Sequence, residues 1–377
     1  MPQYAGKYQY EGQGGPCQIA FETETCIVTP ASGQPIAFDL GDVDRVTPGE
    51  WEMSVTLYTG RTLQLRQFGA VFSRMQEEWL AAWRDRVVQC LLLEDLEEVA
   101  HFDAAANGVP AQIRLYRSNL AAIPNAADPI QLRLADVDST AFDESTYGVT
   151  LQAGVGRLVV SKLAKKTEEF REKLTAALDA IRSRTAAVLH DTFPFLNPDQ
   201  LQRLVSTMPE GRSVAQSALG AIHPKLSEAL VAAAVDDNLK PYFDELRKRS
   251  TGTWHAGFKF TRPDEQEEGA EPLFFWFFFP MAGKDVVAWE ATTGIGRATY
   301  FFRAGTPVEQ LTRGLALVNF RREPVYLPDE SLDQQPRFHR YAIGARKLPD
   351  LRSLRAAYFG RAIHSSVEEW AQQVSRI

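Results

Sequence analysis

The side chains that could carry catalysis or hold a metal are few in this chain, and they are scattered along it. The six histidines and three cysteines form no HExxH or CxxC spacing, so no two ligands share a helix face or a turn. There is no GxSxG turn around a serine nucleophile and no GxxxxGK[ST] phosphate loop. The residues in question are His101, His190, His223, His255, His339, His364, Cys17, Cys26 and Cys90. We therefore expect no catalytic residue, no metal site and no cofactor, although residues distant in sequence can still assemble a catalytic site.

Two further motifs have both a chemical and a structural interpretation. The GIGRA stretch at 294–298 partly matches a dinucleotide-binding loop, but that fingerprint needs three glycines between a strand and a helix. Here the third glycine is missing and both flanks have strand patterns, so we interpret Gly294 and Gly296 as turn residues. The Asp-Val-Asp triplets at 42–44 and 136–138 offer too few oxygen ligands for a calcium loop. We expect their aspartates to bond nearby backbone N–H groups in turns.

Positive charge is concentrated in one segment near the C-terminus and in one short stretch of the N-terminal half. The candidate contacts for an anion or a partner are Arg114, Arg117, Arg346, Lys347, Arg352 and Arg355. The favoured interpretation of the C-terminal segment is a helix docked on a sheet domain, with its arginines solvated or paired to acidic neighbours. The alternative is a basic face that meets an acidic partner, lipid head groups or nucleic acid.

Composition is that of an ordinary globular protein. The 377 residues are 45% hydrophobic and 24% charged, with a net charge of −7, so the chain as a whole does not attract nucleic acid or anionic lipid. No basic region followed by an apolar run opens the sequence, and the apolar block LFFWFFFPM at 273–281 is less than half of the about 20 residues that a membrane helix needs. We expect a buried strand there, no transmembrane segment, and a cytoplasmic protein with reduced, buried cysteines.

One stretch of sequence occurs twice. QPIAFDLGDVDRV at 34–46 and DPIQLRLADVDST at 128–140 share six of thirteen residues at a constant offset of 94. The match extends backward to CQIAF and AQIRL and forward to Val-Thr-Leu at 55–57 and 149–151. Beyond that point the second copy needs two extra residues to bring Gly156-Arg157 level with Gly60-Arg61. We interpret the two stretches as copies of one folding unit.

Each copy changes its hydrophobic period in the same order. Alternating apolar and polar residues predict strands and hairpins, which are separated by turns rich in Pro, Gly, Asn and Asp. The period then becomes helical, with Met75, Trp79 and Trp83 four residues apart in the first copy. In the second copy the corresponding stripe is Phe170, Leu174, Leu178 and Ile181. We expect each helix to bury this stripe against the sheet that precedes it.

This order of elements resembles the pleckstrin-homology-like (PH-like) fold over residues 14–93 and 108–184. The resemblance implies a small antiparallel sheet or barrel closed by a C-terminal helix. Domains of this family that bind phosphoinositides carry cations around the first hairpin. The first copy has Glu22 and Glu24 there, and the second has only Arg114 and Arg117. The resemblance therefore gives no phosphoinositide site.

The predicted fold class is α+β, with tandem small antiparallel sheets, each capped by a C-terminal helix, and a helical insert. Between 251 and 320 strand patterns resume, and Gly294, Gly296 and Arg297 match Gly154, Gly156 and Arg157, which favours a degenerate third copy. The predicted organisation is repeat 1 at 1–93, repeat 2 at 94–184, a helical insert at 185–250, a β-rich domain at 251–320 and a helical segment at 321–377.

Duplication without catalytic motifs favours a non-enzymatic scaffold or adaptor that binds a protein partner or itself. Sheet edges and the groove beside a capping helix are common peptide-docking surfaces. Two alternatives remain open: a peripheral membrane or anionic-ligand binder that uses the arginines named above, and an enzyme with a site in a cleft between the repeats and the helical insert. Nucleic acid is not an expected partner.

Overall fold

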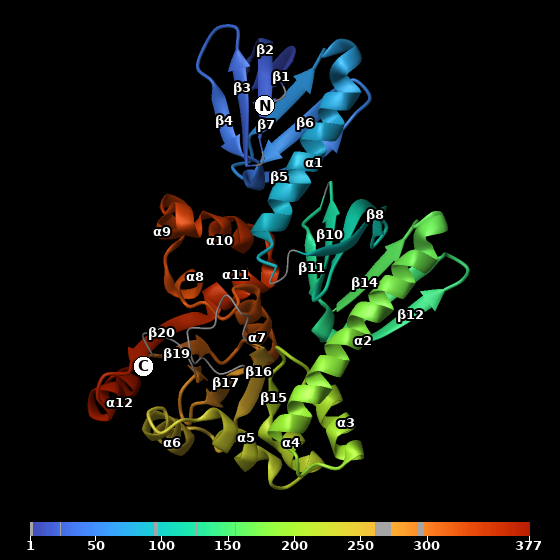
Figure 1. The fold of residues 1–377 in the computed structure, drawn as a ribbon. Coiled ribbons are helices and arrows are strands. Elements are labelled where there is room, and N and C mark those ends of the chain that lie inside the picture. Colours follow the sequence, from blue (N-terminus) through green and yellow to red (C-terminus); the bar gives the residue numbers. More distant parts are fainter. Residues whose placement is uncertain are drawn as a thin grey trace. The chain divides into compact units, whose positions relative to one another are not determined.

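The computed structural model confirms the α+β class, with three antiparallel sheets and helices packed on them (Figure 1). The structure describes residues 3–22, 24–93, 97–125, 127–154, 156–260, 273–292 and 298–377. These form two compact units. Unit 1 comprises Met1–Arg133, Val137–Leu174 and Pro328–Leu348, and unit 2 comprises Leu134–Asp136, Thr175–Leu327 and Pro349–Ile377.

The first repeat is a seven-stranded sheet followed by one long helix. Its strands stand in the order β4-β3-β2-β1-β7-β6-β5. They are β1 (Gln3–Tyr10), β2 (Gln13–Phe21), β3 (Thr25–Pro30), β4 (Ile36–Asp39), β5 (Val43–Pro48), β6 (Glu52–Leu57) and β7 (Thr62–Arg66). The short 3-10 helix η1 (Leu40–Asp42) joins β4 to β5, and η2 (Gly69–Val71) leads into α1 (Phe72–Cys90).

The second repeat has the same element order and the same strand order, β11-β10-β9-β8-β14-β13-β12. Its strands are β8 (Glu98–Ala106), β9 (Val109–Tyr116), β10 (Asn119–Pro124), β11 (Ile130–Arg133), β12 (Val137–Asp143), β13 (Gly148–Ala153) and β14 (Gly156–Ser161). η3 (Leu134–Asp136) occupies the place of η1, and η4 (Ala164–Lys166) precedes α2 (Thr167–Thr192). The two sheets are separate, and α2 continues beyond the boundary predicted at 184.

The strand registers show where the two copies differ in length. In both copies the pairing shifts at the second aspartate of the Asp-Val-Asp triplet, between Val43 and Arg45 and between Val137 and Ser139. Such a β-bulge bends the strand locally. Val43 pairs with Leu57, whereas Val137 pairs with Ala153 rather than Leu151. The two extra residues of the second copy therefore lie in the turn between β12 and β13, and the sequence alignment that placed them after the Val-Thr-Leu match is wrong.

Each capping helix buries most of the stripe that its period predicts. Met75, Trp79 and Trp83 of α1 are buried, as are Phe170, Leu174 and Leu178 of α2, whereas Ile181 is half-buried. The rings of Trp79 and Trp83 are stacked with their centroids 6.4 Å apart. Phe170 meets Phe102 of β8 edge to face at 5.4 Å between centroids. Both helices thus carry the large apolar residues that complete the cores beneath them.

The strands of the third sheet stand in the order in which they occur in the chain, β15-β16-β17-β18-β19-β20, which differs from the order of the two repeats. Its strands are β15 (Val214–Ala215), β16 (His255–Phe260), β17 (Leu273–Pro280), β18 (Val286–Ala291), β19 (Ala298–Arg303) and β20 (Tyr358–Ile363). Residues 294, 296 and 297, which supported a third copy, lie outside the described residues. The segment predicted as helical at 321–377 contributes the strand β20 as well as helices.

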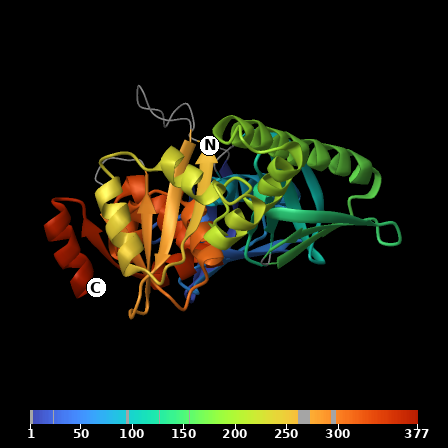
Figure 2. The ribbon, with the colours of Figure 1, turned by 90° about the horizontal axis from the view of Figure 1, so that it is seen from below.

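Helices cover both faces of this third sheet (Figures 1 and 2). Those of unit 2 are α3 (Pro198–Thr207), α4 (Gln216–Ile222), α5 (Leu226–Ala234), α6 (Lys240–Arg249), α7 (Val308–Leu317), α8 (Glu323–Tyr326), α11 (Pro349–Ala357) and α12 (Val367–Arg376). Phe277 packs with Phe243 of α6 at 4.9 Å between ring centroids. Trp276, its neighbour in β17, packs with Phe320 at 4.2 Å. The predicted buried strand is therefore apolar at successive positions because both of its faces are covered.

The helical stripes lead to a test of the shared core arrangement. Replacing Trp79 by Ala is expected to lower the free energy of unfolding by about 3–5 kcal/mol, and replacing Leu174 by Ala by about 2–5 kcal/mol, because each leaves a cavity under its helix. Urea denaturation followed by circular dichroism measures both. Glu77→Ala on the exposed side of α1 is the control and is expected to stay within about 0.5 kcal/mol of the wild type. A Trp79 variant as stable as this control would contradict the arrangement.

Candidate functional site

The turn at η1 is bound to the capping helix of its own repeat by a buried guanidinium. Asp39 Oδ1 accepts a hydrogen bond from the backbone N–H of Gly41 at 2.7 Å. Arg86 of α1 donates from Nε to Asp39 Oδ1 at 2.8 Å and from Nη2 to Oδ2 at 2.6 Å. The Arg86 side chain is only 8% exposed and also pairs with Glu24 at 2.8 Å. This two-point contact fixes the orientation of the turn.

A helix from far along the sequence is docked on this turn. α9 (Asp329–Gln334) and α10 (Pro336–Lys347) belong to the same unit as the first repeat. Arg346 Nη1 of α10 donates to Asp42 Oδ1 at 2.6 Å, and Arg346 also pairs with Asp333. Lys347 Nζ donates to the backbone carbonyl of Val43 at 2.6 Å, and Lys347 is 3% exposed. α10 therefore ends in two cations that bond the turn of the first repeat.

Close packing accompanies these polar bonds. A Cβ atom on Gly41 would lie 2.8 Å from the Ile343 side chain, and one on Gly344 would lie 2.9 Å from the carbonyl oxygen of Cys90. Both distances are shorter than van der Waals contact allows. Tyr58 adds a hydrogen bond from its hydroxyl to the backbone carbonyl of Arg346. The glycines thus allow α10 to approach the turn and the end of α1 closely.

Burial shifts the pKa values of the groups around this contact. Burial raises the pKa of Asp42, while Arg346 and His339 oppose the shift. Burial lowers the pKa of Lys347, and nearby acidic groups oppose that shift. Burial also raises the pKa of the Cys90 thiol to about 12, so this cysteine is protonated at neutral pH and is a packing residue, not a nucleophile.

The corresponding turn of the second repeat also receives an arginine. Arg212 Nη2 donates to the backbone carbonyl of Asp136 at 3.1 Å, and Asp136 is the counterpart of Asp42. The contact differs in chemistry, because the first repeat offers a carboxylate oxygen and the second a backbone oxygen. In both copies, the turn that contains the Asp-Val-Asp triplet thus contacts an arginine from later in the chain, Arg346 in the first and Arg212 in the second.

The structure assigns internal partners to most of the basic residues that the sequence singled out. Arg346 and Lys347 bond the first repeat as described. Arg114 pairs with Asp85 at 2.7 Å. Arg117 is exposed and pairs with Glu97 at 2.6 Å. These four belong to unit 1 and bond separate groups.

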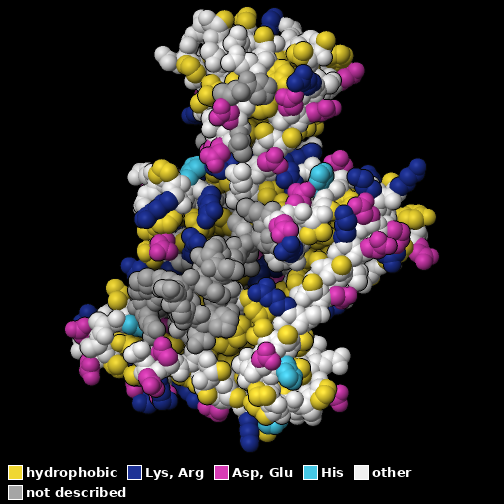
Figure 3. Space-filling view, viewed as in Figure 1, with side chains coloured by type: hydrophobic (Ala, Val, Ile, Leu, Met, Phe, Trp, Pro, Cys, Tyr) yellow, Lys and Arg dark blue, Asp and Glu magenta, His cyan; other side chains and the backbone are white. Residues whose placement is uncertain are grey.

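Arg352 and Arg355 belong to unit 2. Arg355 donates to the carbonyl oxygens of Pro324 and Leu327, so it closes the end of α8. Arg352 is exposed on α11. On the face drawn in Figure 3, lysine and arginine side chains are interspersed with aspartate and glutamate. The six predicted contact residues are thus divided between the two units.

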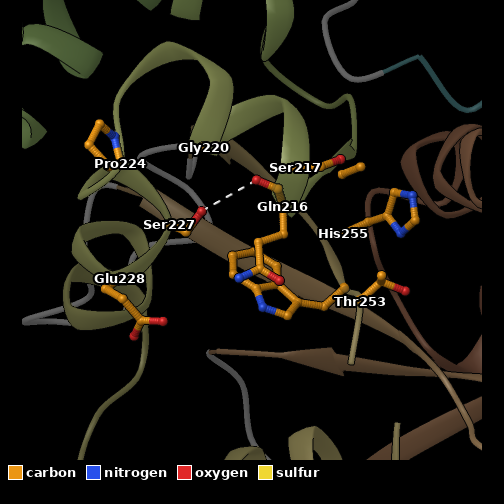
Figure 4. A pocket seen from close by; sticks show the side chains of 10 residues that line it. Gln216, Ser217, Gly220, Pro224, Ser227, Glu228, Thr253 and His255 are labelled. Atoms are coloured by element: carbon orange, nitrogen blue, oxygen red, sulfur yellow. Dashed lines mark hydrogen bonds between the residues drawn. The ribbon is translucent and has the colours of Figure 1, made fainter. Parts of the chain in front are cut away.

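Unit 2 contains a pocket of about 530 Å³ between α4, α5 and the start of β16 (Figure 4). Its lining includes Gln216, Ser227, Trp254 and His255. Ser227 Oγ donates to the Gln216 carbonyl at 3.4 Å. The indole N–H of Trp254 and Nδ1 of His255 are buried in the described structure without a hydrogen-bond partner. The pocket is large enough for a small ligand, but no pairing of a nucleophile with a base is found among its described lining residues.

Unit 2 also contains a buried cluster of hydrogen-bonded polar side chains. Thr299 donates from Oγ1 to Glu290 Oε2 at 2.6 Å and accepts from the Trp370 indole N–H at 2.9 Å. His364 Nε2 lies 3.2 Å from Glu290 Oε2 and 3.1 Å from Thr299 Oγ1. In a catalytic triad the acid and the nucleophile contact opposite ring nitrogens of histidine. Here both contact the same nitrogen, so the group binds α12 to the sheet and is not a triad.

Comparison of the chain with models of known protein families and with curated proteins gave no match. Among the residues that the structure describes, no group of three or more His, Cys, Asp and Glu side chains is placed to hold a metal ion. None of the described helices has both the length and the apolar character needed to cross a membrane.

The pocket histidine gives a pH test. Burial lowers the pKa of His255 from 6.5, and Glu309 partly opposes the shift. Below about pH 6.5 the unfolded chain therefore binds a proton that the folded chain resists, so the free energy of unfolding falls as the pH decreases. Urea denaturation at about pH 7.5 and about pH 5.5 should show a smaller pH-dependent loss in His255→Gln than in the wild type. Equal losses in both proteins would contradict this assignment.

Proposed function

We propose that the protein is a scaffold of two tandem PH-like repeats whose common surface beside the capping helix binds helical or basic segments of proteins. The observation that carries this proposal is the docking of α10 on the first repeat. α10 is separated from its binding surface by about three hundred residues of sequence and is held by the contacts of Arg346 and Lys347. A folded module that binds a distant helix of its own chain offers chemistry suited to a helix of another chain.

The position of α10 supports this interpretation. It lies in contact with the capping helix α1 and with η1. The contact combines an ion pair, a buried lysine on a backbone oxygen and a close glycine approach. Arginine contacts and direct hydrogen bonds of this kind are common in protein interfaces.

The strand order supports the PH-like assignment of the repeats. Each repeat places seven strands before one long amphipathic helix, and both sheets have the same order. The family resemblance rests on this order of elements. Nothing in it requires catalysis, and fold alone does not determine function.

The contacts give less support to the alternative of an anionic-lipid binder. Arg114 and Arg117 are paired with carboxylates, and a phosphate would have to displace those partners. The enzyme alternative has the pocket of unit 2 in its favour, but its described lining lacks a nucleophile with a base. Protein binding is therefore the function that the geometry supports best.

The proposal predicts that α10 can bind in trans when the tethered copy is displaced. Arg346→Glu places a carboxylate against Asp42 and Asp333 and should release α10. A fluorescent peptide spanning residues 328–348 should then bind the Arg346→Glu protein more tightly than the wild type, in which the tethered helix competes at an effective concentration of about millimolar. Fluorescence anisotropy measures the affinity.

The matched control reverses a charge elsewhere on the same helix. Arg337 is exposed, and Arg337→Glu in the protein should leave peptide binding at the wild-type level. A peptide that itself carries Arg346→Glu should bind none of the proteins well. Failure of the wild-type peptide to bind a folded Arg346→Glu protein, verified by circular dichroism, would refute the proposed docking surface.

A further inference from the structure

Both repeats expose one large aromatic side chain at the same structural position. Trp51 directly precedes β6 and is 64% exposed, and Tyr147 directly precedes β13 and is 62% exposed. The strand registers make them counterparts. Met53 pairs with Pro48 in the first repeat, and Val149 pairs with Phe142 at the same place in the second. Trp51 stands two residues before Met53, and Tyr147 stands two residues before Val149. The duplicated unit therefore presents a large exposed aromatic ring at the same position in both copies.

The turns that carry these rings are held in place by the capping helices. Gln76 of α1 donates from Nε2 to the carbonyl oxygen of Gly49 at 3.1 Å. In the second repeat the guanidinium of Arg171, on α2, lies 4.1 Å from the centre of the Phe142 ring. Each of these side chains follows a buried residue of its helix, Met75 or Phe170. Each capping helix therefore contacts the hairpin of its own repeat from an equivalent position, beside the turn that carries the exposed ring.

Carboxylates accompany the ring in both copies. Glu50 and Glu52 flank Trp51, and both are exposed. Asp143 and Glu144 precede Tyr147 and are also exposed. Asp143 accepts hydrogen bonds from the backbone N–H and the hydroxyl of Ser145 at 2.9 and 2.6 Å, and hydrogen bonds from Ser145 and Thr146 lower its pKa. The two turns share little sequence, yet each combines an aromatic ring with two acidic residues.

We propose that each of these two turns binds a lysine- or arginine-rich segment of a partner protein. A cation gains energy over the face of an aromatic ring, with tryptophan the strongest, and adjacent carboxylates add ion pairs. Single contacts of this kind are weak in water. Both turns belong to unit 1, and a partner segment long enough to reach both gains affinity, because the second contact then forms at a raised effective concentration. This inference rests on the proposed scaffold function and names the chemistry of its partner.

The test uses the full chain and a defined probe, a fluorescent peptide of alternating Arg and Gly, compared with one of alternating Glu and Gly. The wild type is expected to bind the arginine peptide and not the glutamate peptide. Trp51→Ala with Tyr147→Ala should weaken binding about tenfold, and Trp51→Phe with Tyr147→Phe by about threefold or less, since phenyl rings retain part of the attraction. Replacing Glu50, Glu52 and Glu144 by Gln should also weaken binding and reduce its salt dependence.

The control removes acidic charge from a different surface. Glu77→Gln with Glu172→Gln changes exposed glutamates on the two capping helices and is expected to bind the arginine peptide like the wild type. Binding that falls equally in the control and in the turn variants would reduce the effect to net charge and overturn the inference. So would an arginine peptide that binds no better than the glutamate peptide. The 328–348 peptide experiment is unaffected by these outcomes, so failure of this inference is distinguishable from failure of the scaffold proposal.

Discussion

The buried pair between Arg86 and Asp39 is the interaction on which the surface of the first repeat depends. A charge removed from water is costly unless it is paired and fully hydrogen-bonded. Arg86 meets this requirement by bonding both oxygens of Asp39, and Asp39 in turn accepts the Gly41 N–H. The geometry of η1 is thereby coupled to α1. Because η1 is fixed, it presents the Asp42 carboxylate and the Val43 carbonyl to α10 in one orientation.

Duplication of the unit preserved its framework while its surface contacts diverged. Strand order, the bulge at the second aspartate of the triplet, and the buried stripe of the capping helix are the same in both copies. The turn contact changed from a carboxylate of Asp42 to a backbone oxygen of Asp136. A backbone oxygen accepts an arginine whatever the side chain at that position is. The framework therefore leaves each copy free to bind a different segment.

Local patterns in the sequence predicted the framework because burial dictates them. The stripe of Met75, Trp79 and Trp83 predicted a capping helix, and the aromatic run of β17 predicted a buried strand. The docking of α10 had no such local signal, because the ion pair of Arg346 with Asp42 joins residues about three hundred positions apart. Arg346 and Lys347 were identified as contact residues from charge alone, and their partner was not predictable. The gap between the copies was misplaced because identical Val-Thr-Leu residues outweighed a register that only strand pairing reveals.

Native-state hydrogen exchange of the α10 amides in the wild type and in Arg86→Met tests the central claim most directly. Arg86 bonds Asp39 at the turn and Glu24, so its loss acts on α10 through the turn and through α1, which α10 also contacts. If the turn holds α10, loss of the guanidinium should reduce protection of the α10 amides well before the sheet of the second repeat exchanges faster. Unchanged protection of α10, in a variant that still folds, would contradict the account.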